Sequence, residues 1–177
     1  MQRPPELAPL ILSLRLDEAS FEVLNELRKQ HFPRERNHLD AHVTLFHALP
    51  GEEESRIKSD LEEICARNSV LPLAFPRPRF LGRGVAIDIE CPQLIQLRAD
   101  ATKSWRELLS PQDAQGWKHP HVTLQNKVAP DVARTLFEEL NQSWQPLDGQ
   151  GEGLCLWRYL GGPWEAVEEW KFQVSGE

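Results

Sequence analysis

The tetrapeptide His42-Val43-Thr44-Leu45 occurs a second time as His121-Val122-Thr123-Leu124, about 80 residues further along the chain. Each copy is followed at a similar distance by a proline that opens a helical pattern, Pro50 in the first case and Pro130 in the second. A chance repeat of this length is very improbable for a chain with six histidines. The repeat therefore predicts an internal duplication.

The pattern around the two motifs repeats as well. Residues 10–16 alternate apolar and polar side chains, which predicts a strand, and Asp17 caps a helix that runs to about residue 31. A strand at 41–49, a helix after Pro50 and an extended, proline-containing stretch at 70–80 complete this half. The second half shows a strand at 85–90, a helix at 92–108, a strand at 121–128 and a helix at 130–144, with two final strands at 152–160 and 165–174. We expect an α+β fold in one bilobal domain spanning residues 1–177, made of duplicated strand-helix-strand-helix-strand units at about 9–82 and 83–174.

Length and charge exclude several functional classes. The chain has 177 residues and a formal charge of −7, so it repels polyanions and is not expected to bind long duplex nucleic acid. It shows neither a membrane-spanning apolar run nor a signal-peptide pattern at its start, which predicts a cytoplasmic protein without a membrane partner. Its three cysteines are isolated and match no zinc or disulfide pattern. Protein partners are not predicted.

Strand geometry predicts which side chains face together. Residues two apart share a face, so His42, Thr44 and Phe46 point one way, and His121, Thr123, Gln125 and Lys127 form the matching set. Val43, Leu45, Val122 and Leu124 point the other way, towards the amphipathic helices. If the halves are related by a pseudo-twofold axis, the two histidine and threonine faces line a central cleft.

Two facing imidazoles suit an in-line displacement at phosphorus. One accepts a proton from the attacking oxygen and the other donates a proton to the leaving oxygen, and histidine can do either near neutral pH. Threonine hydroxyls can donate to the nonbridging phosphate oxygens, where charge accumulates. This chemistry needs no metal and no cofactor.

On these motifs the chain resembles the two-histidine (2H) phosphoesterase superfamily, which includes bacterial 2′-5′ RNA ligase-like proteins and cyclic nucleotide phosphodiesterases. The resemblance covers residues 10–172. It implies a bilobal fold with a central cleft and metal-independent cleavage of 2′,3′-cyclic or 2′-5′ phosphodiester bonds in a small nucleotide or an RNA terminus. It also implies that His42 and His121 are catalytic and that Thr44 and Thr123 bind phosphate. For hydrolysis we expect His121 to activate water and His42 to protonate the leaving ribose oxygen; ligation would exchange these roles.

Residues outside the motifs are candidate substrate contacts. Phe46 is expected beside His42, where it could stack a nucleobase, and Tyr159 is a second stacking candidate, whereas Trp157 and Trp164 are expected to pack in the core. Arg15 and Lys127 share the uncovered strand faces and could contact the phosphate, and Gln125 lies on the His121 face. The remaining candidates are expected to lie outside the catalytic centre: Arg77, Arg79 and Arg83 on a solvated edge and His47 in a packed or rim position.

Two alternatives stay open at this point. The first is a module that recognises nucleotides or RNA ends in the same cleft without chemistry. The second is a metal-dependent hydrolase that uses His38, His42, His119 and His121 as ligands, although no carboxylate cluster completes such a site and it leaves the threonines without a role. Product formation separates the enzyme from the binder, and resistance to a chelator separates it from the metal-dependent hydrolase.

Overall fold

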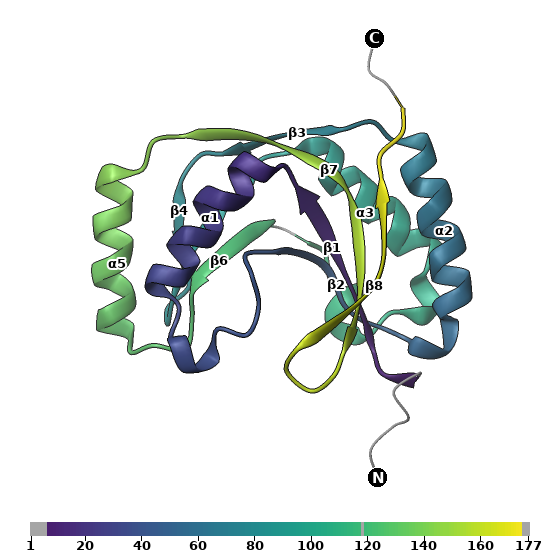
Figure 1. Ribbon diagram of the computed structural model, residues 1–177, viewed down its shortest axis with the longest axis horizontal. Helices are drawn as coiled ribbons and strands as arrows, with labels where there is room; N and C mark the ends of the chain where they lie inside the picture. Colours follow the sequence, from purple (N-terminus) through teal and green to yellow (C-terminus); the bar gives the residue numbers. More distant parts are fainter. Residues whose placement is uncertain (1–6, 118, 175–177) are drawn as a thin grey trace.

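The computed structural model describes residues 7–117 and 119–174. The chain forms the expected α+β fold, with two curled antiparallel sheets flanked by helices in an arch (Figure 1). One side of the arch carries α1 (Glu18–His31) and α5 (Pro130–Ser143), and the other carries α2 (Glu54–Arg67) and α3 (Pro92–Ser104). These four helices begin and end close to where the apolar spacing and the prolines placed them.

The larger sheet has the strand order β2-β1-β7-β3, with β8 paired to β7. Its strands are β1 (Leu10–Leu16), β2 (Val43–Leu49), β3 (Leu71–Phe75), β7 (Leu147–Tyr159) and β8 (Trp164–Lys171). The smaller sheet has the order β4-β5-β6, with β4 (Pro78–Phe80), β5 (Val85–Asp88) and β6 (His121–Gln125). Each motif therefore lies in a different sheet, with one histidine and threonine pair per sheet.

The two sheets do not coincide with the two halves of the sequence. Strand β4 comes from the first half but pairs with β5, and β7 and β8 come from the second half but complete the larger sheet. Helix α1 packs on β6, and α5 packs on β4, so elements of both halves form each lobe. The duplication boundaries at about residues 9–82 and 83–174 remain a prediction.

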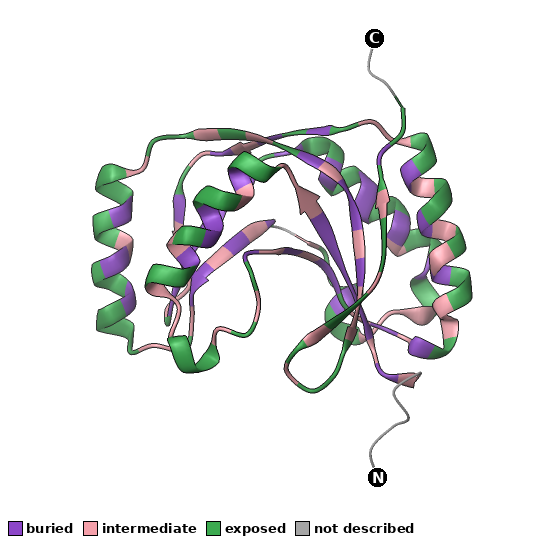
Figure 2. Cartoon of the chain, in the orientation of Figure 1, coloured by how far each residue is buried: buried purple, intermediate pink, exposed green. Residues whose placement is uncertain are grey.

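The helices bury one face and expose the other, as Figure 2 shows. Asp17 caps α1 as expected, since its carboxylate accepts a hydrogen bond of 3.1 Å from the Ser20 amide. The apolar stripe of α2 buries Ile57, Leu61 and Cys65. Helix α4 (Pro111–Ala114) and the 3-10 turn Arg34–Arg36 were not predicted, and two stretches expected as parts of helices, Gly51–Glu53 and Arg106–Leu108, form 3-10 turns. The largest fully buried side chains include Trp105, Phe46 and Phe75.

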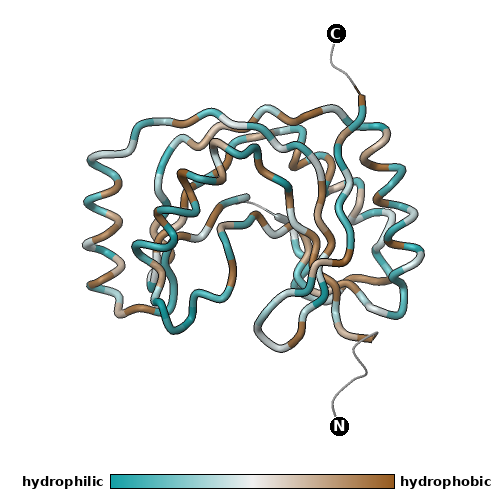
Figure 3. Tube along the Cα trace, in the orientation of Figure 1, coloured by the Kyte–Doolittle hydropathy of each residue, from teal (hydrophilic) through white to brown (hydrophobic). Residues whose placement is uncertain are grey.

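The hydropathy of the chain follows the same layering. Figure 3 shows apolar segments along the inner strands and polar segments along the outer helix faces. Trp105 packs edge-on against Phe46, with ring centroids 5.4 Å apart, and its indole N–H donates to Asp60 at 2.8 Å. In the described residues, no helix is long and apolar enough to cross a membrane.

Each motif strand contains a β-bulge, which interrupts the strict alternation of side-chain direction expected from the sequence. In β2, Thr44 lies opposite Ser13 and Phe46 opposite Leu12, so two steps on β2 match one step on β1. Phe46 is thereby turned into the core, where it is fully buried, and its expected contact with substrate is wrong.

The bulge in β6 falls at the equivalent motif position. Thr123 lies opposite Ala86 and Gln125 opposite Val85, so Leu124 is the extra residue, as Leu45 is in β2. Gln125 is buried, with 5% of its surface exposed, which contradicts its expected place on the open face. Both motif strands therefore carry a bulge at the same motif position, as the expected duplication would require.

Candidate functional site

The two motif histidines have matching surroundings. His42 directly precedes β2, and its Nδ1 lies 2.8 Å from the carbonyl oxygen of Asp40. His121 begins β6, and its Nδ1 lies 2.7 Å from the carbonyl oxygen of His119. A carbonyl oxygen can only accept, so each contact places a proton on Nδ1 and leaves Nε2 free to take or give a proton. In both copies the backbone two residues upstream thus sets the tautomer of the ring.

Burial and nearby cations keep His42 neutral. Burial is the main cause that lowers the pKa of His42 to about 4, and the positive charges of Arg28, His47 and His121 lower it further. The hydrogen bond to the Asp40 carbonyl opposes this effect without cancelling it. His42 is therefore an unprotonated base at neutral pH, and His121 lies close enough to affect its charge.

The two threonines are partly exposed at equivalent places in their sheets. Thr44 lies opposite Ser13 on β1, and Thr123 lies opposite Ala86 on β5. Ser13 accepts a hydrogen bond of 2.8 Å from the indole of Trp157, which marks the open face of the larger sheet. Within the described residues, neither threonine hydroxyl has a hydrogen-bond partner in the protein. Both hydroxyls are therefore available to a ligand.

Two adjoining cavities lie beside His42. One of about 320 Å³ is lined by His42, Phe21, His38, Trp157 and Trp164, among others, and the second, of about 260 Å³, shares His42, Phe21 and Trp157. The Trp164 ring centroid lies 4.7 Å from that of His42, and the two indoles are 5.9 Å apart. Trp157 and Trp164 were expected to pack in the core, but they form a wall of the site instead.

The remaining candidate contacts are distributed unevenly. Arg15 lines the second cavity but forms an ion pair with Glu169. Tyr159 is exposed and lies opposite Trp164 in the β7-β8 pairing, outside the residues that line these two cavities. Lys127 follows the end of β6 with a φ of 62°, in the left-handed region, so it does not continue the strand face. Of this group, only Arg15 lines either of the cavities beside His42.

His47 of β2, for which a packed or rim position was expected, is half exposed. The bulge turns His47 outward, where its ring Nδ1 lies 3.2 Å from Oδ1 of the fully buried Asp113. The same carboxylate accepts hydrogen bonds from the His47 and Ala48 amides. Burial raises the pKa of Asp113, but the hydrogen bonds from the His47 ring and from these two amides outweigh it and lower the pKa overall. This contact attaches the α4 turn, in the segment leading to His121, to the strand of the first motif.

Three of the four histidines proposed as metal ligands, His42, His119 and His121, make other contacts through Nδ1. His119 Nδ1 lies 3.2 Å from a guanidinium nitrogen of Arg79, which itself pairs with Asp88. In residues 7–117 and 119–174, no three His, Cys, Asp or Glu side chains are grouped as a metal ion would require. His38, His42, His119 and His121 therefore do not form the ligand set that the alternative requires.

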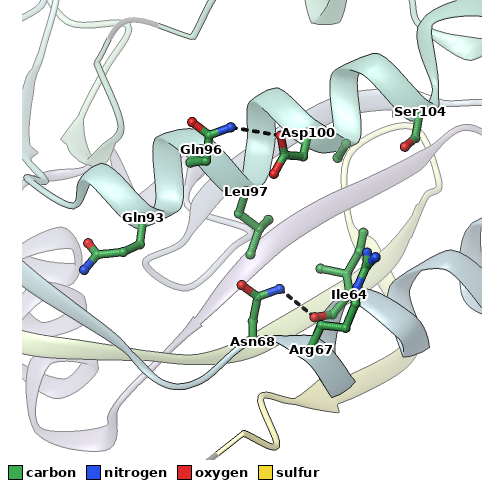
Figure 4. A pocket seen from close by; sticks show the side chains of 9 residues that line it. Ile64, Arg67, Asn68, Gln93, Gln96, Leu97, Asp100 and Ser104 are labelled. Atoms are coloured by element: carbon green, nitrogen blue, oxygen red, sulfur yellow. Dashed lines mark hydrogen bonds between the residues drawn. The ribbon is translucent and has the colours of Figure 1, made fainter. Parts of the chain in front are cut away.

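Two further cavities lie away from the aromatic wall. One of about 670 Å³ adjoins His119 and is lined by Arg77, Arg79, Asp88 and Glu90, so its two cations face two carboxylates. The other, of about 290 Å³, lies between α2 and α3 (Figure 4). Its polar walls bond internally, from Asn68 to the Ile64 carbonyl and from Gln96 to Asp100. None of these four cavities is lined by Thr44, Thr123 or His121; of the four motif residues, only His42 lines any of them.

Comparison with known proteins gives one family and one fold. The model of the 2′-5′ RNA ligase superfamily matches residues 16–163. The fold is similar to TT0787 of Thermus thermophilus, with a TM-score of 0.66 and 17% identity over 93% of this chain and 97% of that one. It is equally similar to Escherichia coli LigT complexed with 3′-AMP, with a TM-score of 0.66 and 18% identity over 95% of this chain and 99% of that one. A search of curated proteins found no match.

Proposed function

Because the chain belongs to the 2′-5′ RNA ligase superfamily, we propose that it is a metal-independent phosphodiesterase. Its substrate would be a nucleotide or an RNA terminus that carries a 2′,3′-cyclic phosphate or a 2′-5′ phosphodiester bond. The observation that carries the proposal is the pair of histidines in different sheets, each with Nδ1 at the carbonyl two residues upstream. Two such rings present two free Nε2 atoms, which acid-base catalysis at one phosphate requires.

His42 is the better general base for hydrolysis. Its lowered pKa leaves it unprotonated at neutral pH, so it accepts a proton from water as the water oxygen bonds to phosphorus. The bond from phosphorus to one ribose oxygen breaks, and His121 donates a proton to that oxygen. The ring opens with the net addition of one water, giving a phosphate monoester. This assignment reverses the one expected from the sequence, because burial of His42 is not visible in the motif.

The threonines and the indoles complete the proposed site. Thr44 and Thr123 would donate to the nonbridging oxygens, which gain charge in the transition state. Trp157 and Trp164 offer apolar faces beside His42, suited to stack the nucleobase of the same substrate. The base would lie on the His42 side of the scissile phosphate. In the reverse direction, 2′-5′ ligation, the two histidines would exchange their tasks.

The proposal is tested by a substrate screen with product analysis. The four 2′,3′-cyclic mononucleotides and a 2′-5′ dinucleotide are incubated with the protein, with and without a chelator, and the products are resolved. We expect the protein to convert at least one cyclic mononucleotide to a phosphate monoester or to cleave the 2′-5′ dinucleotide. The rate should be the same with and without the chelator. Affinity without any product would favour the nucleotide-binding module, and loss of turnover on chelation would favour the metal-dependent hydrolase. The expected location in the cytoplasm and action on RNA remain predictions.

A further inference from the structure

A buried arginine of α1 touches both motif regions at once. Arg28 is only 4% exposed, and its Nε lies 3.1 Å from both the Leu39 carbonyl and Oδ1 of Asn37, in the loop that leads to His42. Its Nη1 donates to the carbonyl of Thr123 at 2.8 Å. Thr123 belongs to the second motif, in the other sheet. One guanidinium thus joins the approach to the first histidine to the strand of the second.

A buried arginine of α3 makes the reciprocal connection. Arg98 is 5% exposed, and its Nε donates to the carbonyl of Leu45 in the first motif at 2.8 Å. Its Nη2 donates at 2.9 Å to the carbonyl of Asp113, in the segment that leads to His121. Each arginine therefore lies on the helix preceding one histidine and bonds the motif strand of the other half. Each half of the sequence thus contributes one arginine that bonds the motif strand of the other half.

Neither guanidinium is placed there by simple ion pairing. Both donate mainly to backbone carbonyls, and both stack on aromatic rings, Arg28 over Phe32 at 4.0 Å and Arg98 over Phe46 at 4.6 Å. Burial lowers the pKa of Arg28 to about 10, opposed by the charge of Asp40. Burying a charge is costly unless it is well bonded. A planar fork with several fixed donors holds several backbone segments at set distances, which an apolar side chain cannot do.

Asn25, one turn before Arg28 on α1, holds the same loop. Its Oδ1 accepts from the Ala41 amide at 2.8 Å, and its Nδ2 donates to the Asp40 carboxylate at 3.3 Å. Arg28 and Asn25 therefore fix the chain on both sides of the Asp40 carbonyl, the group that orients the ring of His42. A small shift of this carbonyl would turn the imidazole.

We propose that Arg28 and Arg98 are positioning residues that hold the two His-x-Thr strands in register across the site. The inference rests on the proposed function, since the register matters only if both histidines act on one phosphate. Arg28 fixes the loop before His42 relative to Thr123 of the second motif. Arg98 fixes the segment before His121 relative to Leu45 of the first motif. Their loss should lower kcat more than it raises KM, because the nucleobase wall formed by Trp157 and Trp164 belongs to other elements.

Arg28 has a second, electrostatic effect that Arg98 lacks. Arg28 is among the charges that lower the pKa of His42, together with His47 of β2 and His121 of β6. The other charged or titratable groups that line the cavities beside His42 are Asp40, His38, the thiol of Cys155 and the ion pair of Arg15 with Glu169. Removing the Arg28 charge should therefore raise the pKa of His42, whereas a lysine should keep it low. The same change at Arg98 should leave this pKa nearly unchanged.

The test uses Arg28→Lys, Arg28→Gln, Arg98→Lys and Arg98→Gln in the full chain. Displacing a reacting group by about 1 Å can cost about 10²-fold in rate, so we expect kcat to fall roughly 10-fold to 100-fold in all four variants. Lysine should not restore the rate, because a single ammonium group cannot make the several hydrogen bonds that the planar guanidinium makes. Arg56→Gln is the matched control: Arg56 is an exposed arginine paired with Glu107 on the outer surface, and its loss should leave kcat unchanged.

Two measurements accompany the kinetics and keep the test decisive. Thermal unfolding identifies any variant that fails to fold. If an Arg28 variant fails, Asn25→Ala replaces it, because it removes a contact to the same loop without removing a charge. An NMR titration of the histidine ring protons needs no substrate, so it decides the electrostatic part even if no turnover is found in the wild type. Folded Arg28→Gln and Arg98→Gln variants with wild-type kcat, together with an unchanged pKa of His42 in Arg28→Gln, would overturn the proposal.

Discussion

Replacing either motif threonine by valine should remove activity and leave the fold intact. Thr44 and Thr123 lie in strands, where valine is well tolerated and has nearly the same shape. Within the described residues their hydroxyls bond no other group of the protein, so no buried donor or acceptor is left unpaired. The free energy of unfolding should change by no more than about 0.5 kcal/mol, the usual range for such surface positions.

The expected loss of activity follows from the charge on the phosphate. A hydrogen bond to a charged group contributes about 1.5 to 3 kcal/mol, and each 1.36 kcal/mol corresponds to about tenfold in rate. Each valine variant should therefore lose roughly tenfold to 150-fold in kcat/KM. The effect should be similar for the two positions, because their places in the two sheets are equivalent.

The assay measures kcat/KM on the best cyclic phosphate substrate beside thermal unfolding of the same preparation. Thr135→Val is the matched control, since this exposed threonine of α5 bonds only its own helix and should keep full activity. A histidine-bound metal would predict the opposite pattern, with little effect of valine and inactivation by a chelator. Wild-type kcat/KM in both Thr44→Val and Thr123→Val would refute the reasoning.

Three further predictions concern the core, the aromatic wall and the pH profile. Phe46→Ala should destabilise the protein by about 3 to 5 kcal/mol, since the ring is fully buried against Trp105; denaturant unfolding checks this, and a change below about 1 kcal/mol would contradict the burial. Trp164→Ala should raise KM for a cyclic mononucleotide about 5-fold to 150-fold, the range for one stacked base; an unchanged KM would place the base elsewhere. The acid limb of kcat/KM should lie near pH 4, because activity is lost only when His42 becomes protonated, and a limb at the ordinary histidine pKa would show that His42 is not the base.

The motif repeat and the periodicity around it predicted the family and the element order because these depend on local pattern, whereas the catalytic roles of His42 and His121 remain a prediction. Strand and helix periods, proline starts and the Asp17 cap are all visible in a single sequence, and they match the structure within a few residues. The place of Phe46 was not predictable in the same way. A bulge shifts every following side chain to the other face, and neither motif contains a glycine or proline that marks it.

The residues that surround the motifs depend on contacts between distant segments. Trp157 and Trp164 reach His42 only because β7 and β8 join the sheet of the first half, which no local pattern reveals. The buried arginines did leave a signal. Arg28 follows Leu24 by one turn and Arg98 follows Leu94 by one turn, so each cation lies on the apolar stripe of its helix. A charged residue on the core-facing stripe of a helix indicates a buried polar partner, but the sequence pattern does not identify that partner.

The most direct test of the account is kcat/KM for His42→Ala, His121→Ala and the double variant on the best substrate found. General acid-base catalysis predicts that each single variant loses about 10² to 10⁴ in kcat/KM while unfolding at the wild-type temperature. The double variant should lose far less than the product of the two single losses, because the two rings act on one displacement. Wild-type activity in either single variant would contradict catalysis by paired histidines.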